Sequence, residues 1–141
     1  MTACQPSAQS LADTLPREID SEPTRITTVQ DELSGLVTDD ALKALGRERQ
    51  DASIAFATAD PDLLVLAITV RGIGGTELLH ALESTWPNSG PTESATIGDR
   101  NVTTSEEPCG ARVSFYVSDA VVYVVETADE AIASSVLRAL P

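Results

Sequence analysis

The residues of this chain that could do chemistry are few and widely spaced. The sequence contains two cysteines, Cys4 and Cys109, and one histidine, His80. A metal site needs several Cys, His or carboxylate ligands at characteristic spacings, and an activated nucleophile needs a base beside it. His80 stands alone in a leucine-rich segment with a helical pattern, and neither cysteine has an evident base near it. We therefore expect no catalytic residue, no metal site and no cofactor.

Two other motifs have the composition of ligand sites. The glycine-rich run 72–75 lies between an apolar segment and a predicted helix, where phosphate-binding loops occur. Glu77 stands where the third glycine of a dinucleotide motif belongs, and no P-loop lysine follows, so we interpret the run as a strand-to-helix connection. Asp60, Asp62 and Asp119 could form a weak calcium site if their turns converged. Aspartates also begin turns for local reasons, which is the simpler interpretation.

The charge balance excludes one class of partner. Twenty-two acidic and nine basic residues give a net charge of −13. Nucleic-acid binding requires a basic surface that releases counterions, so we expect no nucleic-acid partner. No apolar run approaches the roughly 18 residues of a membrane span, so contact with a membrane is expected only through a lipid anchor.

The chain divides into three parts by composition. Residues 1–9 are polar and without periodicity, and we predict a flexible tether. Residues 10–50 are weakly apolar and predict a partly helical cover segment, with a β-branched strand at 24–30 and a helix capped by Thr38. Residues 51–141 carry the strong patterns and predict an α+β core domain.

Within the core domain, apolar alternation and turn residues predict three hairpins. Their turns fall at 60–62, at Gly98-Asp99 and near Ser118-Asp119. A helix is predicted after the first hairpin, with Leu78, Leu82 and Trp86 on one stripe, and a second helix after the third, with a capping box from Thr127 to Glu130.

This order, ββα-ββ-ββα, predicts an antiparallel sheet of about six strands with the two helices on one face. The two ββα units share a coarse pattern, with Ile54 and Phe56 in the first matched by Val113 and Phe115 in the second. Either an internal duplication or the small number of α+β arrangements explains this pattern.

Two strands are apolar on both alternating sets of positions, which is typical of central strands covered on both faces. If both helices cover one face, the other must be covered by residues 10–50, by a second copy of the chain or by a protein partner. The candidate interface residues on that face are Leu63, Val65, Val122 and Val124.

Cys4 lies in a context typical of a lipoprotein cleavage site. In "MTACQPSAQS" an apolar residue and a small residue precede the cysteine, and a polar run follows it. The charged and hydrophobic segment of a signal peptide does not precede it in this sequence. Cys4 is therefore a candidate for lipid attachment, or its presence is incidental, and Cys109 is expected to be a free thiol.

Over residues 10–141 the sequence resembles a group of exported proteins of high-GC bacteria, many of them lipoproteins. The resemblance rests on the order of "LADTLPREI", "DDALKALG", "ASIAFA", "ITVRGIGGTELLHAL", "TIGDRNVTT" and "VSFYVSDAVVYVVETADEAIASSVLRALP". It implies a location in the cell envelope and a noncatalytic domain, and it implies no activity.

From these observations we expect a noncatalytic binding or structural domain, exported and lipid-anchored through Cys4, rather than an enzyme. Its expected partner is another protein or a second copy of the chain. The alternative is a cytosolic adaptor or assembly subunit in which Cys4 has no role.

Overall fold

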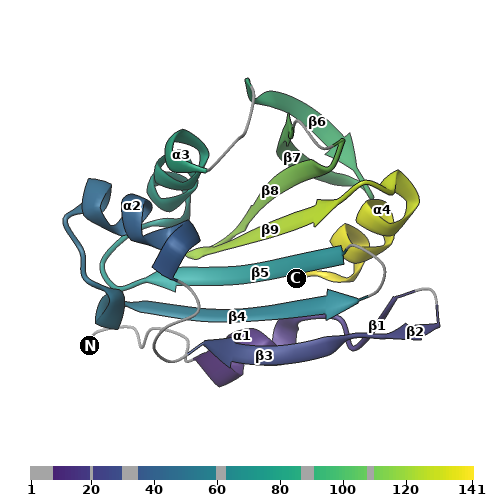
Figure 1. Cartoon of the computed structure of the whole chain (residues 1–141), viewed down its shortest axis with the longest axis horizontal. Coiled ribbons are helices and arrows are strands. Elements are labelled where there is room, and N and C mark those ends of the chain that lie inside the picture. The colour runs from purple at the N-terminus through teal and green to yellow at the C-terminus, as the bar shows by residue number, and fades with distance from the viewer. Residues whose placement is uncertain (1–7, 20, 30–34, 60–62, 87–90, 108–109) are drawn as a thin grey trace.

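The computed structural model describes residues 8–19, 21–29, 35–59, 63–86, 91–107 and 110–141 (Figure 1). Its centre is a seven-stranded antiparallel sheet with the strand order β3-β4-β5-β9-β8-β7-β6. A separate two-stranded sheet pairs β1 with β2. The strands are β1 (Glu18–Ile19), β2 (Glu22–Pro23), β3 (Arg25–Val29), β4 (Ala52–Ala59), β5 (Leu63–Val70), β6 (Glu93–Ile97), β7 (Arg100–Glu106), β8 (Arg112–Ser118) and β9 (Val121–Thr127). The helices are α1 (Ala8–Thr14), α2 (Gly35–Leu45), α3 (Gly75–Thr85) and α4 (Glu130–Ala139), with a 3-10 turn at Arg49–Asp51.

The α+β class and the antiparallel sheet agree with the sequence prediction, whereas the strand count and the full order of elements do not. The sheet has seven strands rather than about six, because β3 pairs with β4 along its whole length. The predicted ββα-ββ-ββα order covers residues 51–141 only, and the N-terminal part adds α1, β1, β2, β3 and α2 before β4. The weakly apolar N-terminal part therefore contributes an edge strand to the main sheet as well as helices.

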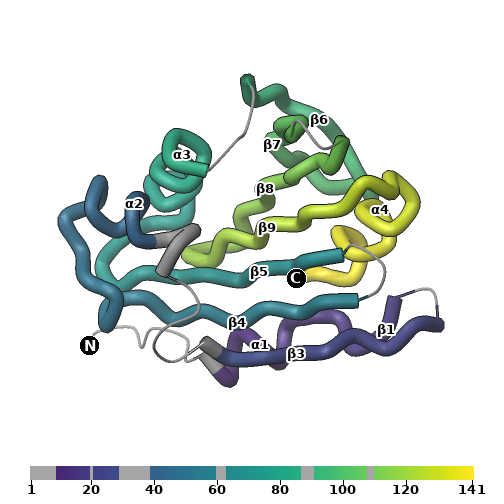
Figure 2. The backbone as a smooth tube through the Cα atoms, in the orientation of Figure 1, coloured from purple at the N-terminus to yellow at the C-terminus, as the bar shows by residue number. Residues whose placement is uncertain are grey.

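The prediction that the two helices of the core share one face is wrong. α3 buries Leu78 and Leu82 against one face, together with α2. α4 buries Val136 and Leu137 against the opposite face, together with α1. The reason is that β5 and β9 are apolar on both faces, so two helices on one side would leave the other row of apolar side chains exposed. Figure 2 shows α2 and α3 close together and α4 apart from them, towards the other end of the strands.

The N-terminal segment supplies one helix to each face rather than one continuous cover. Leu11 and Leu15 pack with the α4 layer, whereas Ala41 and Leu42 pack with the α3 layer. α2 begins at Gly35, before the predicted cap at Thr38, and ends at Leu45. It is followed by Gly46, whose φ of 69° is the left-handed conformation that favours glycine.

The two ββα units differ in the face that their helix covers. Ile54 lies in the same buried cluster as α3, as predicted for a helix that folds back onto its own hairpin. Val113 also lies in that cluster, but the following helix, α4, covers the other face. The match between the two units therefore extends to their strands and not to the placement of the helix.

An arginine fixes the C-terminal end of α4. Arg100 donates hydrogen bonds to the carbonyl oxygens of Leu137 (3.2 Å) and Leu140 (2.6 Å) and to the hydroxyl of Tyr116 (3.0 Å). Its guanidinium also lies 5.3 Å from the centre of the Tyr116 ring. Since the last carbonyls of a helix have no partner within the helix, this arginine acts as a C-terminal cap supplied by β7.

The turn between β6 and β7 contacts α4 at its middle. Gly98 and Asp99 have φ values of 57° and 64°, which two-residue hairpin turns require at both central positions. A Cβ atom at Gly98 would lie 3.2 Å from Cγ of Arg138 and still closer to the carbonyl oxygen of Ser134. This close approach brings the tip of the β6–β7 hairpin against α4 and sets the width of the space between them.

Candidate functional site

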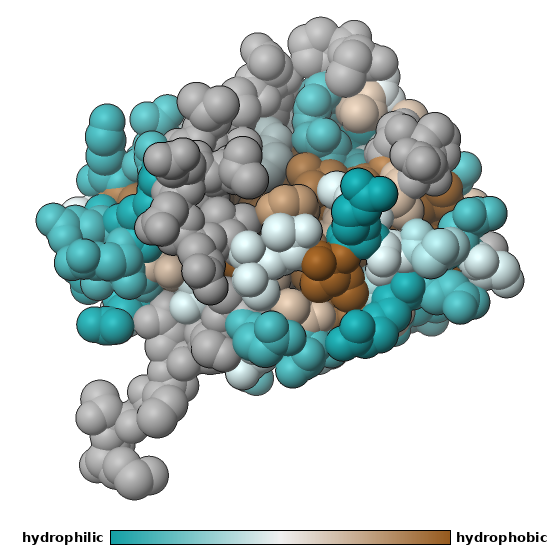
Figure 3. All heavy atoms as spheres, turned by 60° about the horizontal axis from the view of Figure 1, so that its bottom comes forward, coloured by the Kyte–Doolittle hydropathy of each residue, from teal (hydrophilic) through white to brown (hydrophobic). Residues whose placement is uncertain are grey.

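The four predicted interface residues do not form an exposed surface. Leu63 and Val65 are buried in the layer of α1 and α4, and Val122 and Val124 are buried in the layer of α2 and α3. Of the alternatives considered for covering the sheet, the chain's own helices apply: α1 and α4 cover one face, and α2 and α3 cover the other. Figure 3, which brings the β3 side forward, shows hydrophobic residues in small groups among hydrophilic ones on that side.

The other sequence candidates are not brought together. Cys4 and Cys109 lie outside the described residues. His80 lies on an exposed position of α3. Among the described residues, no three His, Cys, Asp or Glu side chains are grouped closely enough to hold a metal ion. No helix in the described part of the chain is long and apolar enough to cross a membrane.

Of the three turn aspartates considered above, only Asp119 lies among the described residues. Asp60 and Asp62 lie outside the described residues, but the strands that they join end at Ala59 and Leu63. β5 begins beside the end of β9, at the Leu64–Glu126 pair, whereas Asp119 precedes the start of β9. Asp119 therefore lies at the opposite end of the β5–β9 pair from the ends of β4 and β5 at Ala59 and Leu63.

The glycine-rich run has a structural role. A Cβ atom at Gly75 would lie 2.6 Å from Cγ1 of Val117 and closer still to the carbonyl oxygen of Asp119. The first turn of α3 thus packs directly on the β8–β9 turn, which only a residue without a side chain allows. This contact explains the glycine without a phosphate ligand.

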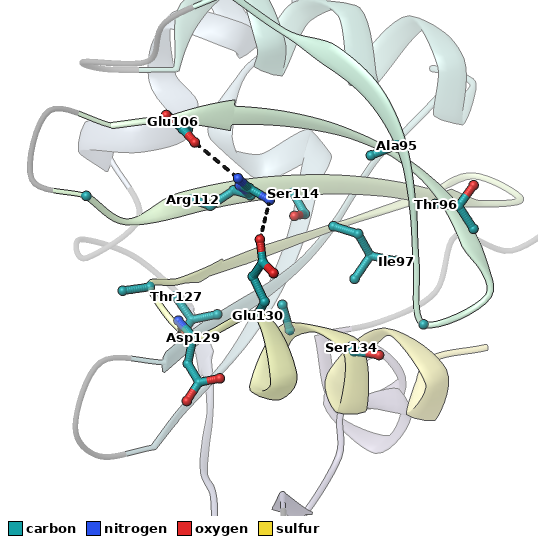
Figure 4. A pocket seen from close by; sticks show the side chains of 14 residues that line it. Ala95, Thr96, Ile97, Glu106, Arg112, Ser114, Thr127, Asp129, Glu130 and Ser134 are labelled. Atoms are coloured by element: carbon teal, nitrogen blue, oxygen red, sulfur yellow. Dashed lines mark hydrogen bonds and ion pairs between the residues drawn. The ribbon is translucent and has the colours of Figure 1, made fainter.

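The clearest candidate site is a polar hollow centred on Arg112, near the end of the sheet where α4 begins (Figure 4). It has a volume of about 430 Å³, which lies within the range of small-ligand sites. A second hollow of about 480 Å³ adjoins it on the outer side of Arg112 and shares Ala95 and Glu106 with it. The two hollows form one groove, and the Arg112 side chain lies between them.

Sheet register and one helix position the walls of this groove. Arg112 on β8 pairs with Glu106 on β7 and with Thr127 on β9, so these three side chains lie in one row across the sheet. Ser114, two residues along β8 on the same face, is buried, as is Thr127. The first turns of α4 form one wall, and β6 with the Gly98 turn forms the other.

Arg112 is held by two carboxylates. Its guanidinium donates to Oε1 of Glu106 at 3.1 Å and to Oε1 of Glu130 at 3.0 Å, and Figure 4 shows it between the two. The hydrogen bond that Arg112 donates to Glu106, with the negative charges of Glu130 and Glu106, raises the pKa of Arg112. The carboxylates themselves face solvent, with side-chain exposures of 76% for Glu106 and 79% for Glu130.

The groove has a surplus of negative charge. Glu93, Glu106, Asp129 and Glu130 border it, and Arg112 is its only cation, which leaves three negative charges among these lining residues. Asp129 also caps α4, because its Oδ1 accepts hydrogen bonds from the backbone N–H groups of Ala131 (2.9 Å) and Ile132 (3.2 Å). The predicted cap, Thr127, instead accepts from the N–H of Asp129 at 3.2 Å.

A further hollow lies on the opposite face of β6. It has a volume of about 540 Å³ and is lined by hydroxyl and apolar side chains from α3, β6, β7 and β8. Thr76 and Leu79 of α3 form one side, and Ser94 and Thr96 of β6 form the other. Strand β6 therefore has a hollow on each of its faces.

A pair of glutamates on the α3 side of the sheet has unusual electrostatics. Glu126 lies on β9, the central strand, between Leu64 and Val113. Burial, a hydrogen bond to Glu107 and the charge of Glu107 raise the pKa of Glu126 to about 7. The pair lies outside the Arg112 groove, and we assign it no ligand.

Sequence reasoning missed the groove because its parts are far apart in the chain. Glu106 and Arg112 face each other across the β7–β8 hairpin, and Glu130 joins them only because α4 folds onto this face. The one available signal was the pair of opposite charges, Glu106 and Arg112, on either side of segment 107–111.

Comparisons with protein-family models, with curated protein sequences and with solved structures find no significant match to this chain.

Proposed function

We propose that this chain is a noncatalytic binding domain that recognises a basic partner in the Arg112 groove. One observation carries the proposal: Arg112 is already engaged by Glu106 and Glu130, and the groove still has more carboxylates than cations. Each exposed glutamate uses Oε1 for Arg112 and presents the rest of its carboxylate toward solvent. A lysine or arginine of a partner can pair with the same carboxylates.

An anionic ligand fits the groove less well. Its arginine has two intramolecular carboxylate partners, which an anion would have to displace. The N-terminus of α4, a position that often binds anions, is filled by the Asp129 carboxylate. The net charge of −13 also attracts basic partners and repels acidic ones at long range.

We further propose that the domain is exported and acts at the cell envelope, held there by lipid on Cys4. The support is the sequence around Cys4 and the resemblance to exported proteins described above. The alternative is a cytosolic adaptor or assembly subunit with an incidental Cys4. Detergent phase partitioning of the native protein separates the two, because an acylated chain enters the detergent phase and a Cys4→Ala chain does not.

The binding proposal is tested with an acetylated, amidated seven-residue peptide that alternates arginine with valine. Its fluorescein-labelled form is titrated with the protein, and fluorescence anisotropy reports binding. Replacing both Glu106 and Glu130 by Gln should weaken binding about five- to thirtyfold, because each exposed ion pair contributes about 0.5–1 kcal/mol. Raised salt should weaken binding to the unaltered protein as well.

The matched control replaces Glu77 and Asp40, which lie on exposed positions of α3 and α2, by Gln and Asn. It removes the same charge from another part of the surface. Binding by this control should stay within about twofold of the unaltered protein. Equal losses in the two double variants would show attraction to net charge alone and would refute the groove as the site.

A further inference from the structure

Strand β6 forms one edge of the main sheet. On the side away from β7, no described strand pairs with it. The β6–β7 turn has two residues, and Ile97 and Arg100 close it. In such a hairpin the closing pair exchanges both backbone hydrogen bonds, and alternate pairs do the same. Ala95 and Glu93 therefore bond to β7, whereas the N–H and C=O groups of Ser94 and Thr96 point away from β7.

The side chains of β6 alternate between the two hollowed faces. Glu93 lines only the hollow beside Arg112 and Ser94 only the hollow beside α3, whereas Ala95 and Thr96 border the hollows on both sides. A strand added next to β6 would alternate in the same way. Every second side chain of the added strand would face the acidic groove. The side chains between them would face the hollow beside α3, whose apolar lining includes Leu79, Phe115 and Val117.

We infer that β6 binds its partner as an extended strand, which adds an eighth strand to the sheet. Backbone hydrogen bonds to Ser94 and Thr96 hold the strand, and hollows for alternate side chains give selectivity, as in other proteins that bind peptides at a sheet edge. The partner is a peptide segment with basic residues at alternate positions, facing Glu93 and Glu106, and small apolar or hydroxyl residues between them. This inference rests on the proposed function, since the same acidic groove supplies the preference for basic side chains.

A second copy of the chain is the less favourable occupant of this edge. Each copy has a net charge of −13, and pairing β6 with its equivalent would bring the two acidic grooves together. Like charges across an interface oppose association. The β6 segment, "ESATI", contains no basic residue that would offset this repulsion.

The test uses the alternating arginine–valine peptide and a form of it with N-methyl groups on alternate backbone nitrogens. N-methylation removes the donors that a strand needs and keeps every side-chain charge. We expect the N-methylated peptide to bind at least tenfold more weakly. Equal binding of the two peptides overturns the inference, whether or not any protein variant folds.

The matched protein variants change Thr96. Thr96→Pro removes an outward-facing N–H without removing a bond to β7, and proline is tolerated on edge strands in this orientation. Thr96→Val keeps the N–H, so any loss of binding by this variant reports the hydroxyl alone. We expect Thr96→Pro to bind at least tenfold more weakly than Thr96→Val, with folding checked by thermal unfolding. Unchanged binding by a folded Thr96→Pro protein overturns the inference.

The outcomes separate this inference from the proposed function. If the Glu106 and Glu130 double variant loses binding while N-methylation and Thr96→Pro do not, the groove binds basic groups but β6 adds no strand. If the peptide does not bind at all, both are wrong. If sedimentation shows a dimer that Thr96→Pro dissociates, a second copy occupies the edge and the peptide inference is wrong.

Discussion

Replacing Glu126 by Gln should make the protein more stable at pH 8 and leave it nearly unchanged at pH 4.5. Glu126 is half-buried on the central strand between Leu64 and Val113. Burial, together with the hydrogen bond and charge of Glu107, raises the pKa of Glu126 from an ordinary 4.5 to about 7. Glutamine resembles the protonated carboxyl in shape and carries no charge, so it removes the penalty of ionisation.

The direction of this change in stability follows from the raised pKa of Glu126. The folded chain holds the Glu126 proton more tightly than the unfolded chain, so this group stabilises the fold at low pH. That contribution is lost as the pH rises through about 7. A pKa increase of this size corresponds to at most about 3.4 kcal/mol. Because Glu126 is only half-buried, solvent screening reduces the expected difference to about 1–2 kcal/mol.

Urea unfolding curves of the two proteins at pH 4.5, 6, 7 and 8 measure this difference. The free energy of unfolding should diverge between the two proteins as the pH rises, with most of the change complete by pH 8. Glu77→Gln, which removes one carboxylate from an exposed position of α3, reports the general effect of net charge. A constant difference between the Glu126→Gln and unaltered proteins at all four pH values would refute the reasoning.

Two further changes test the contacts that hold α3 and α4 on the sheet. Gly75→Ala should lower the free energy of unfolding by about 1–3 kcal/mol, because its Cβ would collide with the β8–β9 turn. Gly74→Ala, whose Cβ would have no atom within 4 Å, should leave this free energy nearly unchanged. Equal effects of the two substitutions in urea unfolding would contradict the close packing at Gly75. Arg100→Met should lower the free energy of unfolding by about 2–4 kcal/mol, because it removes the cap on α4. Arg100→Lys should recover only part of that loss, because lysine lacks the planar guanidinium that bonds to several acceptors. Thermal unfolding measures both variants, and full recovery by lysine would show that charge alone matters.

Local patterns in the sequence predict most of the elements of this fold. The alternation around the turn at Gly98-Asp99 and the apolar stripe of α3 fix the hairpins and helices to within a few residues. The first residue of the last helix, α4, is not predicted correctly from local sequence patterns. "TADE" satisfies a capping pattern from Thr127, but the helix begins two residues later and Asp129 caps it. Both residues accept a backbone hydrogen bond, so sequence spacing alone does not distinguish them.

The placement of the helices could not be derived in the same way. α3 and α4 have similar lengths and similar apolar stripes, and nothing in either stripe specifies a face of the sheet. α1 packs beside α4 on one face and α2 packs beside α3 on the other, so the placement of each helix depends on segments far away in the sequence. The Arg112 groove depends on this outcome, since Glu130 reaches Arg112 only when α4 lies on its side of the sheet.

The most direct test of the binding account is a nuclear magnetic resonance titration of the isotope-labelled chain with the arginine–valine peptide. The account predicts shifts concentrated at the backbone amides of Ser94 and Thr96 and at the side-chain Nε–H of Arg112. These groups lie along the β6 edge and in the groove beside it. Shifts confined to α2 and α3, or no shifts at peptide concentrations that saturate the anisotropy signal, would contradict it.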